Sequence, residues 1–192
     1  MPKILARSVI PDRFIPTHCD RCGAQCRDRI DSDDWNQYVC SANPRHARWI
    51  QSPPVAYVIL IDEFSNTYIV ERGIPPAVGG WCFPGGYVDY GETAEETIVH
   101  ETFGEACIRI GGKRAIYLGQ WFETGPGVTV IGFLVHIRRA DANSFVPNTE
   151  ATSRMAVNFW DMDPETLAFN GNRLALAAAR KIVQRETAFE HP

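Results

Sequence analysis

The stretch that decides the fold is Trp81-Cys-Phe-Pro-Gly-Gly-Tyr-Val-Asp-Tyr-Gly-Glu92 with its continuation Thr93-Ala-Glu-Glu-Thr-Ile-Val-His-Glu-Thr-Phe-Gly-Glu-Ala-Cys-Ile108. Thr93 and Glu96 form a capping box, so the glycine-rich loop is predicted to lead into a helix. On that helix Glu101 and Glu105 lie four residues apart, and both carboxylates project from one face. Like charges so placed repel each other, and a hard divalent cation such as Mg2+ is the natural compensation. An acidic face exposed to solvent is the alternative.

Apolar segments around this stretch predict the strands of a sheet. Residues 55–61 are continuously apolar and rich in β-branched side chains, which indicates a buried central strand. Residues 66–72 alternate in character and predict its partner strand, while residues 128–137 predict another buried strand. Residues 172–188 contain strong helix formers and apolar residues for the core. An α/β domain is therefore predicted after residue 51.

The loop and helix resemble the Nudix box, G-x5-E-x7-R-E-U-x-E-E-x-G-U, in which U is a bulky aliphatic residue. The spacing is kept throughout, and the matching positions are Pro84, Gly85, Gly86, Glu92, Glu101, Glu105 and Ile108. Trp81 and Phe83 also look like the usual approach to the box. The departures are His100 for the box Arg, Thr102 at an aliphatic position, Gly104 for the first of the paired acids, and Cys107 for the late Gly.

The resemblance implies an α/β/α sandwich with a mixed sheet and hydrolysis of a nucleoside diphosphate linked to another group. It implies Mg2+ or Mn2+, with Glu105 as principal ligand and Glu101 as second ligand or base. The Gly85 carbonyl would be a further ligand, Gly85 and Gly86 would contact the substrate, and Glu92 would organise the helix. In such a reaction the metal ions neutralise the charge of the phosphates, and a carboxylate positions the attacking water.

Two of these departures from the box predict a metal site with fewer ligands and a weaker orienting residue. Gly104 removes an acid and, within a helix, costs about 1 kcal/mol relative to Ala, so fewer or weaker metal ions are expected. His100 lacks the permanent charge and rigid fork of Arg, which weakens its expected orienting role. The competing hypothesis is a Nudix-like domain that binds a nucleotide or a protein partner without turnover.

The third catalytic acid and the substrate contacts are less constrained by the sequence. Glu150, in a polar loop, is the preferred third acid by analogy with related proteins, and Glu123 is its competitor. Trp121 and Phe122 are candidates to sandwich a nucleobase, although a role in the core is at least as consistent with the sequence.

A separate cluster of cysteines precedes this domain. The pattern C-x2-C-x17-C-x5-H predicts a zinc site made of Cys19, Cys22, Cys40 and His46. Cys26 is a rival fourth ligand and His18 a weaker one, and ordinary reduced thiols are the alternative. A closed site of four protein ligands is structural. The aromatic residues nearby are expected to pack on the ribbon rather than stack on a base, namely Trp35, Tyr38 and Trp49.

Composition and charge divide the chain. The predicted domains are an N-terminal extension at 1–14, a zinc ribbon at 15–50 and a Nudix hydrolase domain at 51–192. Residues 1–50 carry a net charge of +2 and residues 51–192 one of −6, and the total of −4 provides no global basic field for duplex DNA. Residues 55–61 form the longest apolar run, against about 20 residues for a membrane span, so a cytoplasmic protein is expected.

A zinc ribbon before a Nudix domain is similar to the NADH pyrophosphatase group and to some ADP-ribose hydrolases. The expected partner is therefore a small nucleoside diphosphate derivative: NAD(H)-like, ADP-ribose-like or a nucleotide sugar. RNA gripped by the slightly basic ribbon, with a cap as the target, is a less favoured alternative. A homodimer is compatible with the sequence, and no membrane partner is expected.

Overall fold

The computed structural model describes residues 12–28 and 37–190. Contacts separate the chain into two compact units, residues 1–52 and 53–192, which are described one at a time. Most of the predicted N-terminal extension, and Trp35, lie outside the described residues. None of the helices in the described part of the chain has the length and hydropathy required to cross a bilayer.

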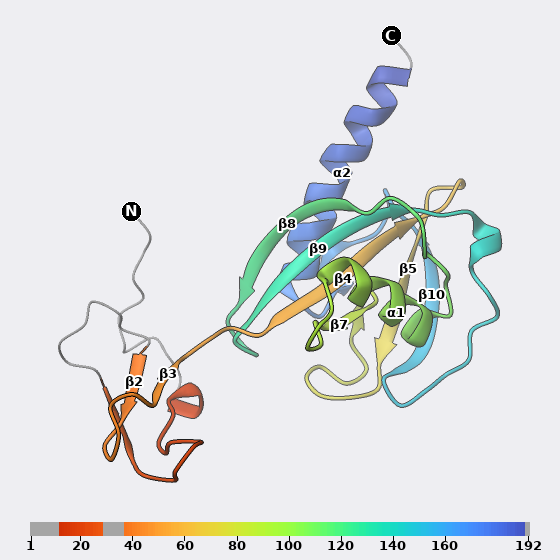
Figure 1. Cartoon of the computed structure of the whole chain (residues 1–192). Helices are drawn as coiled ribbons and strands as arrows, with labels where there is room; N and C mark the ends of the chain where they lie inside the picture. The colour runs from red at the N-terminus through yellow and green to blue at the C-terminus, as the bar shows by residue number, and fades with distance from the viewer. Residues whose placement is uncertain (1–11, 29–36, 191–192) are drawn as a thin grey trace. The chain divides into compact units, whose positions relative to one another are not determined.

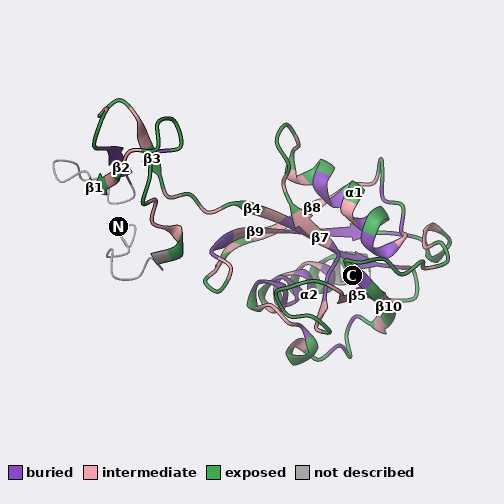
Figure 2. Ribbon diagram, turned by 90° about the horizontal axis from the view of Figure 1, so that it is seen from below, coloured by how far each residue is buried: buried purple, intermediate pink, exposed green. Residues whose placement is uncertain are grey.

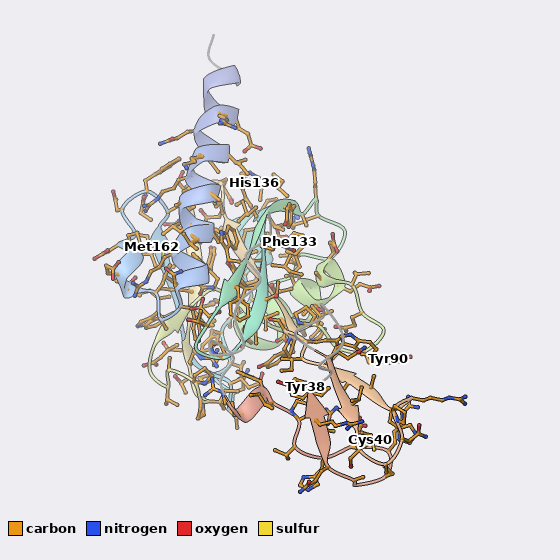
Figure 3. All side chains as sticks on the ribbon, turned by 90° about the vertical axis from the view of Figure 1, so that its left-hand side faces the viewer. Tyr38, Cys40, Tyr90, Phe133, His136 and Met162 are labelled. Atoms are coloured by element: carbon orange, nitrogen blue, oxygen red, sulfur yellow. The ribbon has the colours of Figure 1, made fainter. Side chains whose placement is uncertain are left out.

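The first unit is built on a small antiparallel sheet. After a 3-10 turn at Asp12–Phe14, the strands β1 (Cys26–Asp28), β2 (Gln37–Cys40) and β3 (Ala47–Trp49) lie in the order β1-β2-β3. The buried apolar residues among those described in this unit are few, namely Cys19, Tyr38, Val39 and Cys40. Figure 3 labels two of them, Tyr38 and Cys40. So little apolar burial provides little free energy for folding.

The second unit contains the mixed sheet that the sequence predicts. β4 (Pro54–Ile61) runs parallel to β9 (Val128–His136) along its whole length. β7 (Gly85–Tyr87) pairs antiparallel with the other edge of β4, and β8 (Ile116–Glu123) pairs antiparallel with β9. The order is β7-β4-β9-β8.

Two helices cover opposite faces of this sheet (Figure 1). Because successive strand residues point to opposite faces, β4 contributes Tyr57 and Ile59 to the core under α2 (Asn170–Glu190), and Val58 and Leu60 to the core under α1 (Ala94–Ala106). Figure 2 shows buried residues gathered along the central strands and on the sheet-facing sides of the helices. The predicted α/β/α sandwich is confirmed.

The predicted pairing of residues 66–72 with the first strand is wrong. β5 (Asn66–Arg72) has the predicted bounds, but it lies between β10 (Ala151–Asn158) and β6 (Trp81–Cys82) in a second sheet. The edges of β4 pair instead with β9 along the whole strand and with β7 at residues 55–57, while both edges of β5 are taken by β10 and β6. Two further 3-10 turns lie at Arg139–Asp141 and Pro164–Thr166.

Helix α1 begins as predicted and ends in an unusual way. The Thr93 hydroxyl accepts a hydrogen bond from the Glu96 N–H, and the Glu96 carboxylate accepts one from the Thr93 N–H. At the other end, Cys107 adopts the left-handed conformation (φ 56°) that favours glycine, at the position where the Nudix box has Gly. The backbone thus keeps the geometry of the box although the residue has changed.

Candidate active site

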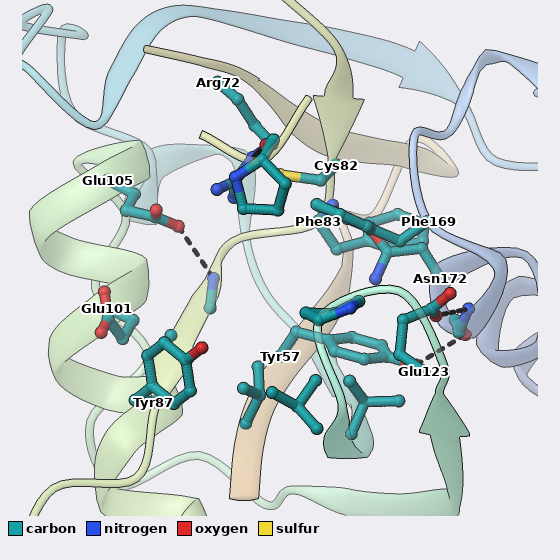
Figure 4. Close-up of a pocket in the computed structure, with 18 of the residues that line it drawn as sticks. Tyr57, Arg72, Cys82, Phe83, Tyr87, Glu101, Glu105, Glu123, Phe169 and Asn172 are labelled. Carbon is teal, nitrogen blue, oxygen red and sulfur yellow. Dashed lines mark hydrogen bonds between the residues drawn. The ribbon is translucent and has the colours of Figure 1, made fainter. Parts of the chain in front are cut away.

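A cavity of about 380 Å³ opens in the second unit, and the box lies along one side of it (Figure 4). Small-molecule sites usually enclose roughly 300–1,000 Å³, so a ligand of nucleotide size fits this scale. Its walls mix apolar and aromatic side chains with a few polar groups. The residues that line it include Val55, Tyr57, Arg72, Phe83, Gly85, Gly86, Glu101, Glu105, Glu123, Val128, Val130, Glu150, Phe169, Gly171 and Asn172.

Three carboxylates meet at one end of the cavity. Glu101 and Glu105 come from α1, and Glu150 comes from the loop that precedes β10. One oxygen from each lies within 4.8 Å of the others, which is a spacing that a single hard cation can bridge. The preferred third acid, Glu150, lies in this cluster, whereas its competitor Glu123 does not.

Burial makes the two carboxylates on α1 costly to ionise. Burial raises the pKa of Glu105 to about 7, although a hydrogen bond from the Gly85 N–H (2.8 Å) opposes the shift and Glu101 adds repulsion. Burial also raises the pKa of Glu101, against the opposing effect of His100. Buried carboxylates that repel one another are stabilised by a bound cation, so the donor set fits a divalent metal ion.

The two glycines of the loop allow the close approach that this cluster requires. A Cβ at Gly86 would overlap the Glu101 carboxylate, and a Cβ at Gly85 would overlap the backbone of β4. Glycine is therefore required at position 85, where the obstacle is backbone, whereas a side chain at position 86 would displace the Glu101 carboxylate from its place in the cluster. The predicted role of the Gly85 carbonyl as a metal ligand stays a prediction.

His100 occupies a more definite position than the sequence suggested. Its Nδ1 lies 3.0 Å from Glu92 Oε1, and its Nε2 lies 3.5 Å from Glu101 Oε1. Glu92 also accepts a hydrogen bond from the Thr97 hydroxyl (3.1 Å). Glu92 thus braces the helix, as expected, and His100 connects it to one of the clustered acids.

Position 104 is open to solvent. No atom lies within 4 Å of a Cβ built on Gly104, so an acidic side chain has room there. The Gly104 carbonyl accepts a hydrogen bond from Asn148 Nδ2 (2.9 Å), which ties the loop carrying Glu150 to α1. An acidic side chain at position 104 would therefore meet no steric obstacle close to its Cβ.

The aromatic residues that line the cavity differ from those proposed from the sequence. Neither Trp121 nor Phe122 is among its lining residues: Trp121 packs partly buried against the core under α2, and Phe122 is 53% exposed. Their proposed role in binding a base stays a prediction. Sequence analysis missed four lining residues from separate segments, namely Tyr57, Phe83, Arg72 and Phe169. The Arg72 guanidinium lies 5.1 Å from the centre of the Phe169 ring.

The N-terminal unit brings together the four residues predicted to bind zinc. One ligand atom each of Cys19, Cys22, Cys40 and His46 lies within 4.8 Å of the others. Cys22 Sγ lies 3.4 Å from Cys40 Sγ, and Cys19 Sγ lies 3.6 Å from His46 Nδ1. Ligand separations in a tetrahedral zinc site with bonds of about 2.3 Å to sulfur are slightly longer, so the cluster fits zinc.

The rival ligands lie outside this cluster, and the backbone favours the thiolate form of one member. Cys26 is on β1 opposite Cys40, and His18 is in an isolated bridge with Gln25. A hydrogen bond from the Arg21 N–H lowers the pKa of the Cys19 thiol, and a thiolate is the form that binds metal.

Comparisons with known proteins agree with this geometry. No curated protein matches the chain. Among solved structures, a NUDIX hydrolase from Nitrosomonas europaea is 20% identical, with a TM-score of 0.65, over 83% of this chain and 88% of that one. The NUDIX domain of Shewanella oneidensis NrtR, solved with ADP ribose, is 16% identical, with a TM-score of 0.57, over 73% and 93%.

An ADP-ribose pyrophosphatase from Streptococcus suis is 21% identical, with a TM-score of 0.51, over 68% of this chain and 93% of that one. These likenesses show the fold. The sequence model of the NUDIX domain matches residues 51–186, which is more than half of the chain and includes the whole box. The chain therefore belongs to the NUDIX family, as its box predicts, and its enzyme class is that of the Nudix-type pyrophosphohydrolases.

Proposed function

We propose that this protein hydrolyses the pyrophosphate bond of a nucleoside diphosphate linked to a second group, using a divalent metal ion. The observation that carries the proposal is the cluster of Glu101, Glu105 and Glu150 at one end of a ligand-sized cavity. The names of two structural neighbours mention ADP-ribose. One is described as an ADP-ribose pyrophosphatase, and the other is a NUDIX domain solved in complex with ADP ribose. ADP-ribose-like and NAD(H)-like compounds and nucleotide sugars are accordingly the proposed substrate class.

The three clustered carboxylates would have different roles in this reaction. Glu105, aligned by the Gly85 N–H, and Glu101 are the proposed metal ligands on α1, and Glu150 is the third acid. A divalent ion held there supplies charge neutralisation on the phosphates and lowers the pKa of water. Glu101 or Glu150 would orient the attacking water, because both carboxylates lie beside the ligand Glu105.

A substrate panel tests the proposal. The full chain is incubated with ADP-ribose, NADH, NAD+ and nucleotide sugars, with Mg2+ or Mn2+, and released mononucleotide is measured. We expect release from at least one compound that requires the metal ion. Binding of these compounds without release would favour the alternative of a nucleotide-binding module, and neither binding nor release would overturn the proposal.

We also propose that the Cys19, Cys22, Cys40 and His46 cluster is a structural zinc site. It offers four protein ligands and leaves no position for water, as in closed structural sites. Elemental analysis of protein purified without added metal should give about one zinc per chain. Zinc far below one equivalent after gentle purification would contradict the proposal.

A further inference from the structure

The cavity has a second polar end that the proposed hydrolytic chemistry does not use. Glu123, the last residue of β8, lines the cavity across from Glu101 and Glu105 (Figure 4). Its Oε2 accepts a hydrogen bond from the backbone N–H of Gly171, 2.7 Å away, in the first turn of α2. An ionised carboxylate offers about four acceptor positions, so this bond leaves most of its capacity for another partner.

The polar groups around Glu123 form hydrogen bonds to other protein groups. The Tyr57 hydroxyl donates to the Gly171 carbonyl (2.7 Å), and Asn172 Oδ1 accepts from the Phe83 N–H (3.1 Å). Tyr57 and Asn172 are only 3% and 4% exposed. This network fixes the start of α2, and with it the Gly171 N–H that orients Glu123. The carboxylate is therefore a pre-positioned acceptor on the cavity wall.

Apolar side chains lie beside this acceptor. Val128 pairs with Glu123 in the sheet, and Val130 lies next to both Glu123 and Val55. Phe83 and Phe169 also line the cavity, with the Arg72 guanidinium 5.1 Å from the centre of the Phe169 ring. A ligand group that fills this end must bury apolar surface and also present a hydrogen-bond donor to a carboxylate. An additional phosphate would be repelled there, whereas a nucleoside satisfies both demands through its ring faces and its N–H or O–H groups.

We propose that Glu123 is a substrate-recognition residue, which accepts a hydrogen bond from an N–H or O–H donor on the nucleoside half of the substrate. The donor is either the exocyclic amino group of the base or the ribose 2′-hydroxyl. This inference rests on the proposed function, because it assigns the part of the substrate that lies away from the metal end. A hydrogen bond to a charged group of this kind changes affinity by about 10- to 100-fold.

Binding of mononucleotides tests the inference without requiring turnover. Calorimetry with AMP, GMP, CMP and UMP in the presence of Mg2+ is performed on the full-length wild type and on Glu123→Gln. The substitution keeps an oxygen for the Gly171 N–H but replaces an acceptor by a donor. The nucleotide bound most tightly by wild type should lose about 10- to 100-fold in affinity. Glu95→Gln, at an exposed position outside the cavity lining, is the matched control and should bind as wild type does.

Two analogues of that nucleotide identify the donor. One is the 2′-deoxy form, and the other has a base without the exocyclic amino group. The analogue lacking the true donor should bind wild type and Glu123→Gln equally, because the contact is absent from both complexes. A merely structural role for Glu123 would weaken the parent and both analogues by the same factor, and that result would overturn the inference.

Other outcomes also decide the question. Equal affinity of all four nucleotides for wild type and Glu123→Gln, or no binding to wild type, would contradict the inference. The panel assay on the same proteins separates the two proposals. Absence of hydrolysis with the binding pattern intact would remove the proposed function alone, whereas hydrolysis and binding unaffected by Glu123→Gln would remove only the role of Glu123.

Discussion

The two clusters of candidate metal ligands depend on the rest of the fold in opposite ways. Residues Cys19, Cys22, Cys40 and His46 lie in a unit with few buried apolar residues, so the proposed zinc ion would supply much of its stability. The carboxylates of Glu101, Glu105 and Glu150 are instead held by elements packed on a mixed sheet with two cores. There the fold supports an unfavourable cluster of charges. The first cluster would thus stabilise the unit that contains it once a metal ion binds, whereas the second cluster is held in place by a unit that is already stable.

The largest effect is expected from breaking the first cluster. Cys19→Ser removes one of four ligands, and structural zinc sites contribute apparent free energies of about 10–16 kcal/mol in small peptides. Amide hydrogen exchange should show lost protection in residues 12–28 and 37–52, with residues 53–190 largely unaffected. Zinc content should fall in parallel.

Cys26→Ser is the matched control for that experiment, because Cys26 lies in the same unit but outside the cluster. It should retain zinc and protection. If Cys19→Ser also kept its zinc and its protection, the account of the first unit as metal-dependent would be wrong.

Breaking the second cluster should affect chemistry far more than folding. Glu105→Gln keeps the volume and an acceptor for the Gly85 N–H but removes a charged ligand. Turnover of the best panel substrate should fall by about 100-fold or more, as for removal of other groups that stabilise transition-state charge. Circular dichroism should be unchanged, and Glu95→Gln should retain wild-type turnover. Full activity of Glu105→Gln would remove Glu105 from the mechanism.

The pH dependence of the free energy of unfolding tests whether the fold holds a carboxyl group of the second cluster in a buried position. Burial raises the pKa of Glu105 from its ordinary 4.5 to about 7, so the folded metal-free protein binds a proton that the unfolded chain releases. The ionisation of Glu105 should therefore lower the free energy of unfolding as the pH rises from about 4.5 to 7. Denaturant titrations across this window should show a shallower decrease in Glu105→Gln. Parallel curves for the two proteins would contradict the burial of an ionisable group there.

The sequence predicted local features well because their causes are local. The capping box at Thr93 and Glu96, the shared face of Glu101 and Glu105, and the buried strand at 55–61 all follow from spacing within one segment. The partner of β5 was mispredicted because strand pairing depends on which edges other segments occupy. The four zinc-ligand candidates converge as their spacing suggested.

The far end of the cavity was not predictable in the same way. It combines Tyr57, Phe83, Glu123 and Asn172 from four separate segments, and only the tertiary fold brings them together. The alternation of side chains along a strand is a signal that the sequence does carry: Trp121 and Phe122 are adjacent in β8, so their side chains point to opposite faces of the sheet. The same alternation places Glu123 on the face of Trp121.

A smaller effect is expected from restoring the missing acid. Gly104→Glu adds a carboxylate one turn from Glu101, at a position with open space. Mg2+ affinity should increase several-fold, and the Mg2+ concentration for half-maximal rate should fall. Gly111→Glu, which adds the same charge at an exposed position outside the cavity lining, is the control. Unchanged metal affinity in a folded Gly104→Glu protein would mean that position 104 does not face the metal.

The smallest effect concerns the core beneath the box. The Thr102 side chain is fully buried, and its hydroxyl has no hydrogen-bond partner among the described residues. Thr102→Val removes that unsatisfied group at nearly constant volume and should raise the free energy of unfolding by about 1 kcal/mol. Thr97→Val is the matched opposite, because the buried Thr97 hydroxyl lies 3.1 Å from both a Glu92 carboxylate oxygen and the Thr93 carbonyl, which share its one proton. Denaturant titrations should move the two variants in opposite directions, and a shared direction would refute this reading.

The central claim is that the carboxylates on α1 and before β10 form a divalent-metal site. Electron paramagnetic resonance of Mn2+ added to zinc-loaded protein measures this directly, since bound and free Mn2+ give different signals. We predict saturable binding by wild type and by Glu95→Gln, and binding weakened at least tenfold in Glu105→Gln and Glu101→Gln. Equal Mn2+ binding by all four proteins would contradict the account.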